Sequence, residues 1–111
     1  MSTWLVTRHP GALQWLRRHG YRDARHVSHL DIELVAKGDT VIGTLPVWMV
    51  AAVTQRGARY FHLTIPLDAA CRGAELTADE LDRLGARLQR YLVCLAPEDA
   101  RRAGPGKLSD R

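Results

Sequence analysis

Short apolar segments alternate with amphipathic segments along the chain, and this alternation constrains the fold more than any other feature. The apolar segments are rich in β-branched or aromatic residues and cover residues 4–6, 26–30, 40–43 and 59–65. With the helical segments between and after them, the order of elements is β-α-β-β-α-β-α. Such an order is typical of a mostly parallel sheet with helices on both faces. We therefore expect a small α/β domain.

Residues that start and stop helices bound the first two predicted helices. The first spans residues 10–19, with Pro10 in its first turn and Gly20 as its stop. The second spans residues 46–56 and follows Thr44, which we expect to be its N-cap. Apolar residues at helical spacing define the faces expected to be buried. They are Ala12, Leu13 and Leu16 in the first helix and Leu45, Met49, Ala52 and Val53 in the second.

A third helix is predicted over residues 77–93. It begins with the capping box Thr77-Ala78-Asp79-Glu80, and leucines recur through it at helical spacing. Beyond it the chain becomes polar and rich in glycine and proline, which predicts a disordered tail over residues 97–111. The expected organisation is therefore one folded domain, residues 1–96, followed by this tail.

Composition narrows the class of protein. The chain has 111 residues, with 16 Lys and Arg against 12 Asp and Glu, an excess that favours anionic ligands but does not indicate binding of long nucleic acids. We expect no signal peptide before Trp4, and the longest apolar run, residues 45–53, is too short to span a bilayer. Cys71 and Cys94 lack a C-x-x-C partner, so we expect reduced thiols and a cytoplasmic location.

The stretch V-T-R-H-P-G-A, residues 6–12, places polar and cationic groups between the first strand and the first helix. Thr7, Arg8, His9 and the amide of Gly11 would lie at the carboxyl end of the strand. Ligands of open α/β sheets bind at that edge, and helix N-termini favour anions. A hydroxyl, a guanidinium, an imidazole and free amides together suit a phosphate. A solvated turn after an edge strand is the alternative interpretation.

Two more strand ends would share this edge if the strands are parallel. His29 and Asp31 follow the second strand, and the turn Gly43-Thr44-Leu45-Pro46 follows the third. Gly43 would let a ligand approach the backbone closely. The G-T-L-P turn is also ordinary helix-capping chemistry. The predicted ligand-binding residues are Thr7, Pro10, Gly11, His29, Gly43, Thr44, Leu45 and Pro46.

Other motifs carry little functional signal. The spacing of His26 and His29 would send them to opposite faces of a strand, so we expect no metal site. No dinucleotide or Walker A motif is present, and we expect no cofactor. His62 is expected to be structural. The tryptophans offer no stacking platform like those of single-strand binders and are expected in the core or a dimer face. They are Trp4, Trp15 and Trp48.

Four motifs in this order carry a resemblance to a known family: V-T-R-H-P-G-A, H-L-D, G-D-x-V-I-G-T-L-P and G-A-R-Y-x-H-L. Over residues 3–92 the chain resembles a small CRISPR-associated family of stand-alone proteins related to the CARF sensor domains of type III systems. The resemblance implies a Rossmann-like, CARF-like domain that forms a homodimer and binds cyclic oligoadenylate across the two-fold axis. A cyclic tetra-adenylate would present equivalent phosphates to the two halves.

The resemblance also implies a ring nuclease, which destroys this second messenger and so switches off the antiviral response. The mechanism we expect needs no metal: a ribose 2′-hydroxyl attacks the adjacent phosphorus. Arg8 would stabilise the phosphoryl charge, helped by the amides around Gly11 and Thr44, and His9 would be the general acid or base. Asp31 would hold a ribose hydroxyl or orient a basic residue.

Two other functions fit the same residues. A non-catalytic binder would sequester or sense cyclic oligoadenylate with the same crevice, and would protect the intact ring. A regulatory subunit would instead bind a protein or RNA through its basic surface, with a steep salt dependence for long RNA.

Overall fold

Within the part of the chain that the structure describes, five strands form a single sheet: β1 (Thr3–Val6), β2 (Arg25–Val27), β3 (Thr40–Gly43), β4 (Arg59–Thr64) and β5 (Arg87–Tyr91). The computed structural model describes residues 1–66 and 75–96, and its strands lie in the order β2-β1-β3-β4-β5. Neighbours among β1 to β4 run parallel, whereas β5 runs antiparallel to β4. The expected mostly parallel α/β fold is confirmed. The predicted tail and Cys71 lie outside the described residues.

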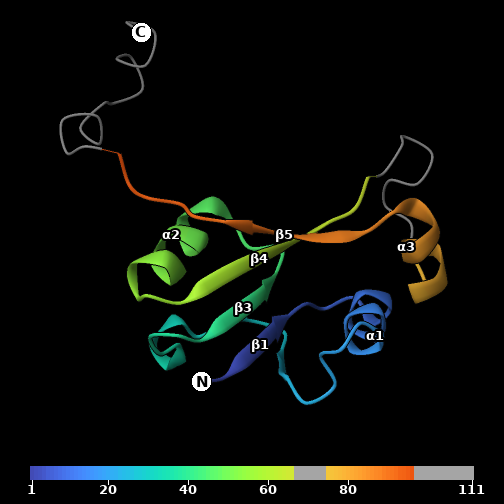
Figure 1. The fold of residues 1–111 in the computed structure, drawn as a ribbon, viewed down its shortest axis with the longest axis horizontal. Coiled ribbons are helices and arrows are strands. Elements are labelled where there is room, and N and C mark those ends of the chain that lie inside the picture. Colours follow the sequence, from blue (N-terminus) through green and yellow to red (C-terminus); the bar gives the residue numbers. More distant parts are fainter. Residues whose placement is uncertain (67–74, 97–111) are drawn as a thin grey trace, which may run out of the picture.

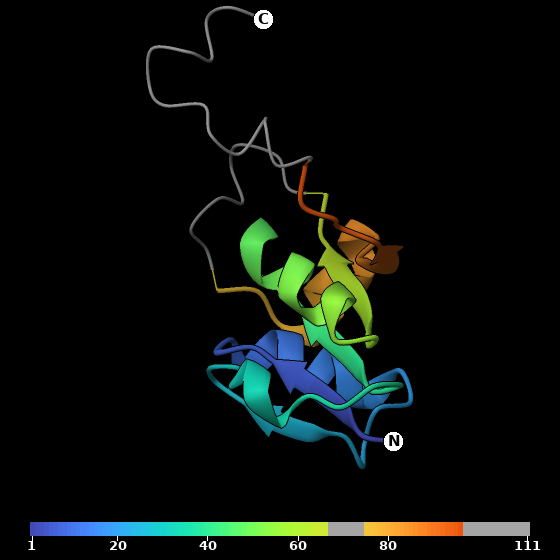
Figure 2. The ribbon, with the colours of Figure 1, turned by 90° about the vertical axis from the view of Figure 1, so that its left-hand side faces the viewer.

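Helices cover both faces of the sheet: α1 (Pro10–Arg18) and α3 (Ala78–Leu84) on one, α2 (Val47–Gln55) and a 3-10 turn, η1 (Ile32–Leu34), on the other. Figure 1 shows α2 on the side of the sheet away from α1 and α3, and Figure 2 shows the same layers turned by 90°. Adjacent residues of β1 pack on opposite faces of the sheet: Trp4 on the α2 side and Leu5 on the α1 side. This alternation divides the core into two clusters.

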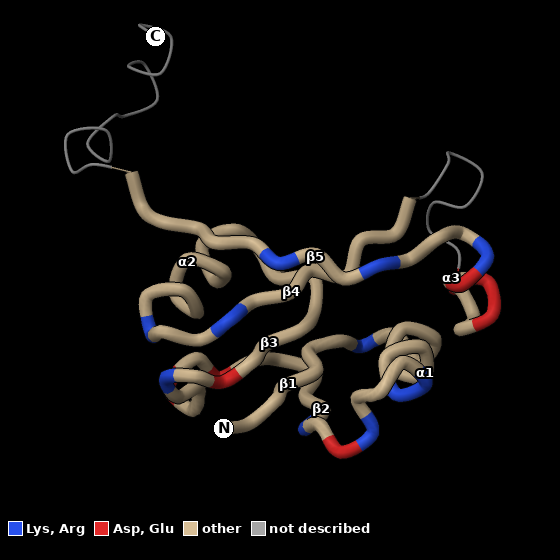
Figure 3. The backbone as a smooth tube through the Cα atoms, viewed as in Figure 1, with Lys and Arg blue, Asp and Glu red and all other residues tan. Residues whose placement is uncertain are grey.

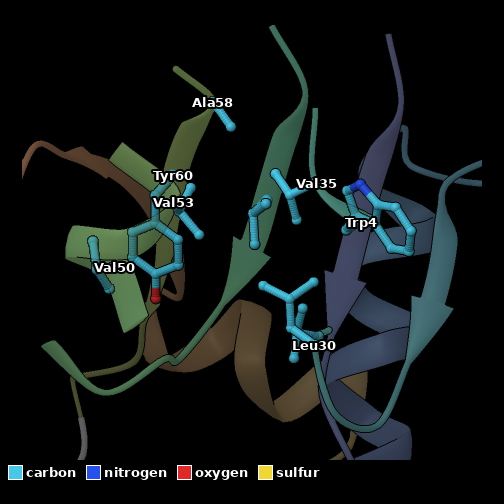
Figure 4. Close-up of a cluster of buried hydrophobic side chains, with 9 residues drawn as sticks. Trp4, Leu30, Val35, Val50, Val53, Ala58 and Tyr60 are labelled. Atoms are coloured by element: carbon cyan, nitrogen blue, oxygen red, sulfur yellow. The ribbon is translucent and has the colours of Figure 1, made fainter. Parts of the chain in front are cut away.

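The cluster on the α2 side is built around an aromatic residue of β4. Tyr60 is 1% exposed and packs with Val50 and Val53 of α2, while Trp4 and Leu30 close the far end of the cluster (Figure 4). On the other face, side chains from three strands meet α1 and α3. They are Leu5, Ile42 and Leu63, packed against Leu16 and Leu81.

The first helix follows the sequence prediction closely. It begins at Pro10 and ends at Arg18, and Gly20 takes the left-handed conformation expected of a helix stop, with φ 108°. Its buried face is slightly different, because Trp15 is buried where Leu13 was expected. The Trp15 indole donates a hydrogen bond of 2.6 Å to Asp82 Oδ1 of α3, and this contact joins α1 to α3.

Charged residues also join α1 to α3. Arg18 contacts Asp79 at 2.7 Å, and His19 Nε2 lies 3.0 Å from Asp82 Oδ1. In Figure 3 the acidic positions of α3 lie beside α1, which ends in basic residues. The hydrogen bonds from His19 and Trp15 hold the pKa of Asp82 below its usual value. All four side chains in these contacts are exposed, so the contacts orient the two helices more than they stabilise the fold.

The start and buried face of the second helix differ from the prediction. The N-cap is Pro46 in an extended conformation, and not Thr44. Since Leu45 N–H donates to the Tyr60 hydroxyl at 2.9 Å, the backbone before Pro46 is held out of the helix. The buried residues of the helix are Val50, Ala51 and Val53, of which only Val53 was expected.

The predicted helix over residues 77–93 is wrong in its second half. The capping box forms as expected, with Thr77 Oγ1 accepting from Glu80 N–H, but the helix ends at Leu84. Gly85 takes the left-handed conformation, with φ 82°, and the chain turns back as β5 beside β4. Leucine spacing alone did not distinguish the two structures, because a helix and a strand can both bury Leu88.

Shorter differences affect the other strands. The second strand is Arg25–Val27, so the segment predicted over residues 26–30 leaves the sheet early. A single 3-10 turn, η1, follows Asp31. Strand β4 ends before Pro66 and is paired on both sides.

A buried carboxylate ties the amino-terminal end of the sheet together. Asp39 is 3% exposed and accepts from Ser2 N–H at 2.8 Å, Ala36 N–H at 2.9 Å and the Trp4 indole at 3.2 Å. The two backbone hydrogen bonds hold the pKa of Asp39 below its usual value of 3.8. This one group therefore links the start of β1 to the loop before β3.

We expect Asp39→Asn to lower the free energy of unfolding by about 2–4 kcal/mol at neutral pH, because an amide cannot accept all three donors. Asp39 has a lowered pKa in the folded state, so its contribution is present above the unfolded pKa and is lost as pH falls through the folded one. The difference from wild type should therefore shrink below about pH 4. Urea denaturation across pH measures it. The exposed Asp23→Asn is the control, and an equal loss in both would contradict this role.

Candidate functional site

A pocket of about 390 Å³ lies at the carboxyl edge of the parallel strands. It is lined by residues at or after the ends of β1, β2 and β3: Val6, Thr7, Arg8, His9, Ser28, His29, Leu30, Thr44, Leu45, Pro46, Trp48 and Met49. Strand β1 leads into α1 on one face of the sheet, and β3 leads into α2 on the other. Chain order reverses between β1 and β3, and open α/β sheets bind ligands in the crevice at such a point.

The charge of the pocket is positive. Arg8 and His9 are exposed and line it together with His29, and none of the described residues that line it carries a carboxylate. Within the described residues, no acidic side chain pairs with the Arg8 guanidinium. The pocket can therefore attract an anion without a competing internal partner.

Both helices that start at the pocket leave their first amides without a side-chain cap. The N-caps are His9 for α1 and Pro46 for α2, and neither helix has an acidic residue in its first turn. The N-terminal end of a helix carries a partial positive charge, which an anion usually neutralises. The pocket therefore combines the start of α2 with Arg8, which suits an anion, and its lining reaches α1 only at the N-cap, His9.

Hydrogen bonds fix the backbone that carries Arg8. His9 N–H donates to Thr7 Oγ1 at 3.1 Å, and Thr7 N–H donates to the carbonyl of Val27 at 3.2 Å. His26 lies beside this loop, with Nε2 2.8 Å from the Thr7 carbonyl oxygen. Since a carbonyl only accepts, His26 Nε2 carries the proton. Arg8 thus extends from a loop that is held on both sides.

The opposite wall depends on the hydroxyl of Tyr60. It accepts from Leu45 N–H at 2.9 Å and donates to the Gly43 carbonyl at 3.0 Å. His62 Nδ1 lies 2.8 Å from the same oxygen. A hydroxyl has one proton and two lone pairs, so His62 donates through Nδ1 and the Tyr60 oxygen is saturated. The structural role expected of His62 agrees with this contact.

The structure does not bring every predicted site residue to the pocket. Gly43 was expected to admit a ligand, but a Cβ there would lie 2.5 Å from the Val6 carbonyl oxygen, so the glycine allows β3 to approach β1. Asp31 does not line the pocket, because its carboxylate accepts from Glu33 N–H at 3.1 Å and caps η1. The Leu45 amide is likewise taken by Tyr60.

Pro10 and Gly11 face a different hollow, of about 250 Å³, between the start of α1 and residues 75–77. A Cβ on Gly11 would overlap the Leu76 carbonyl oxygen, at 1.8 Å. This glycine is therefore required by packing between α1 and the segment before α3. His9 borders both hollows.

Sequence reasoning missed several contributors to the pocket. Ser28 and Met49 line it, and Tyr60 supports it from beneath. Trp48, expected in a core or a dimer face, is 67% exposed and also lines the pocket. Its position in the first turn after G-T-L-P was the available signal, since that turn was already assigned to the site.

The described residues form neither a metal-binding cluster nor a membrane-spanning helix. No group of three or more His, Cys, Asp or Glu side chains in that part of the chain gathers closely enough to hold a metal ion. Cys94 is an exposed free thiol. None of the helices formed by residues 1–66 and 75–96 has the length and apolarity needed to cross a membrane.

A model of a known protein family matches most of the chain. Residues 4–94 match a family model described as "Putative CRISPR-associated protein (Cas_VVA1548)". No curated protein and no solved structure matches the chain significantly. The match covers every residue that lines the pocket.

We expect Tyr60→Phe to destabilise the protein by about 1–3 kcal/mol, because Leu45 N–H and the Gly43 carbonyl lose a shared partner. Chemical denaturation measures the loss. Tyr91→Phe is the matched control, since the Tyr91 hydroxyl is exposed and lies 3.4 Å from its nearest partner, Gln89. Equal stability of the two variants would show that the hydroxyl does not fix the turn.

Proposed function

The chain belongs to this CRISPR-associated family, and from that premise we propose that it is a ring nuclease that binds and cleaves cyclic oligoadenylate. The observation that carries the proposal is the pocket at the β1/β3 crevice, where Arg8 meets the uncapped N-terminus of α2 and none of the described lining residues is a carboxylate. A cyclic oligonucleotide with a phosphate at every linkage suits such a pocket. Destroying this second messenger would switch off the antiviral response.

The proposed reaction is an internal transfer at phosphorus. A ribose 2′-oxygen attacks the adjacent phosphorus in line, and an O2′–P bond forms while the P–O5′ bond breaks. The 2′-hydroxyl gives up its proton and the leaving 5′-oxygen gains one, so no water or metal is consumed. The products are a 2′,3′-cyclic phosphate and a 5′-hydroxyl. Such a reaction needs the sugar held in the attacking conformation and charge stabilisation on phosphorus.

Two residues carry the chemistry in this proposal. Arg8 stabilises charge on the phosphoryl oxygens, because it lines the pocket and its guanidinium pairs with no carboxylate of the described residues. His9 transfers a proton, since imidazole can donate and accept protons near neutral pH. Asp31 is left out of this chemistry, because its carboxylate caps η1.

A homodimer completes the proposal. One copy of the chain offers one pocket of about 390 Å³ at the edge of its sheet. A cyclic tetra-adenylate has repeated phosphates, and a two-fold axis would offer equivalent pockets to opposite linkages. The ring would then lie between two copies of the chain.

Cleavage of cyclic oligoadenylate should survive EDTA. The proposed nucleophile is part of the substrate, and the charge is stabilised by Arg8 rather than by an ion. The test incubates the purified protein and EDTA with cyclic tri-, tetra- and hexa-adenylate, followed by mass spectrometry. Linear products with 2′,3′-cyclic phosphate ends are expected. An absolute requirement for added magnesium or manganese, or 3′-hydroxyl products, would overturn the mechanism.

We expect Arg8→Ala to lower both affinity and turnover, and His9→Ala to lower turnover with little change in affinity. Loss of Arg8 removes a contact present before and during reaction, so affinity should fall about tenfold to a hundredfold and turnover with it. Loss of His9 should leave binding within a few-fold but slow single turnover by about a hundredfold or more. Dissociation constants and single-turnover rates of both variants measure the split.

Arg83→Ala is the charge-matched control, because Arg83 is exposed in the last turn of α3, away from the pocket. It should bind and cleave like wild type. A His9→Ala protein that cleaves at the wild-type rate would rule out proton transfer by His9. Tight binding with the ring left intact by the wild-type protein would instead identify a sponge.

A further inference from the structure

Trp48 is not part of the hydrophobic core. It is in the first turn of α2 and 67% exposed, yet it lines the same pocket as Arg8 and His29. The other two tryptophans, Trp4 and Trp15, are each 4% exposed and belong to the core. The exposed indole is therefore part of the site and not of the fold.

We propose that the Trp48 indole stacks on an adenine base of the ligand. The inference rests on the proposed function and deepens it, because it assigns the base as well as the phosphate. A nucleotide presents a flat aromatic base and an anionic phosphate a short distance apart, joined by the ribose. Trp48 comes from α2 and Arg8 from the end of β1, so the aromatic and the cationic group belong to different walls of one pocket.

Stacking also accounts for the choice of residue. Aromatic side chains bind nucleobases face to face, and tryptophan offers the largest flat surface among them. A purine overlaps an indole more than a pyrimidine does. Trp48 would thus favour adenylate rings over uridylate rings with the same phosphates. Phosphate contacts alone carry no such base preference.

The exposed indole gives a direct readout. The chain has three tryptophans, and two are buried, so quenching of fluorescence by acrylamide reports mainly on Trp48. The probe is a cyclic tetra-adenylate with 2′-deoxyribose, which lacks the attacking hydroxyl and stays intact under the proposed mechanism. Binding of this ring should protect the indole from acrylamide. An indole that remains equally quenchable with the ring bound would overturn the stacking.

Affinities of variants complete the test. Trp48→Ala should bind the adenylate ring about tenfold to a hundredfold more weakly, and Trp48→Phe should recover most of that loss. Val47→Ala is the control, because Val47 is 68% exposed beside Trp48 but does not line the pocket. The matching uridylate ring should lose less affinity in Trp48→Ala. Wild-type affinity of Trp48→Ala for the adenylate ring would overturn the inference.

Two further outcomes distinguish failure of the stacking from failure of the proposed function. Rings that are bound and cleaved equally by wild type and Trp48→Ala would leave the proposed function standing and remove only the stacking. A wild-type protein that binds no adenylate ring would overturn both. By light scattering, Trp48→Ala without ligand should have the same oligomeric state as wild type. A changed oligomeric state would assign the indole to a contact between copies and overturn its role in stacking on a base.

Discussion

The Tyr60 hydroxyl is the interaction on which the site depends. It is fully buried, and it is saturated by Leu45 N–H, the Gly43 carbonyl and His62 Nδ1. Burial raises the pKa of this hydroxyl, so the neutral group that can donate to Gly43 is retained. Because these bonds hold the turn after β3 in one conformation, α2 begins at Val47 and not earlier. The wall of the pocket follows from that start.

The order of the strands supplies the other half of the site. Strand β1 lies between β2 and β3, and all three run parallel, so their carboxyl ends meet at one edge. Gly43 makes the pairing close, since any side chain there would meet the Val6 carbonyl. With α1 and α2 on opposite faces, a crevice at this edge is unavoidable. Such a crevice is a property of the topology, and its residues decide what it binds.

The alternation of strand and helix, and the edge that would carry Arg8 and His9, could be read from the sequence because both are local patterns. The errors over residues 85–93 and at Gly43 have tertiary causes, whereas the one at Asp31 is local. Leucine spacing through residues 77–93 fits a helix until Gly85 takes a left-handed conformation and β4 offers a partner strand. The role of Gly43 depends on the Val6 carbonyl, which is distant in sequence. The role of Asp31 depends on a local cap, and residue spacing does not reveal which group its short side chain will reach.

The positive character of the pocket depends on where the acidic residues are used. Lys and Arg exceed Asp and Glu only slightly. Since none of the described residues that line the pocket is acidic, the Asp and Glu side chains of that part of the chain are placed elsewhere. Asp39 is buried under three donors, Glu80 closes the capping box of α3, and hydrogen bonds lower the pKa of both. Asp82 accepts from the Trp15 indole. Because these anions are held by structural hydrogen bonds, none competes for Arg8, whose charge stays directed at whatever enters the crevice.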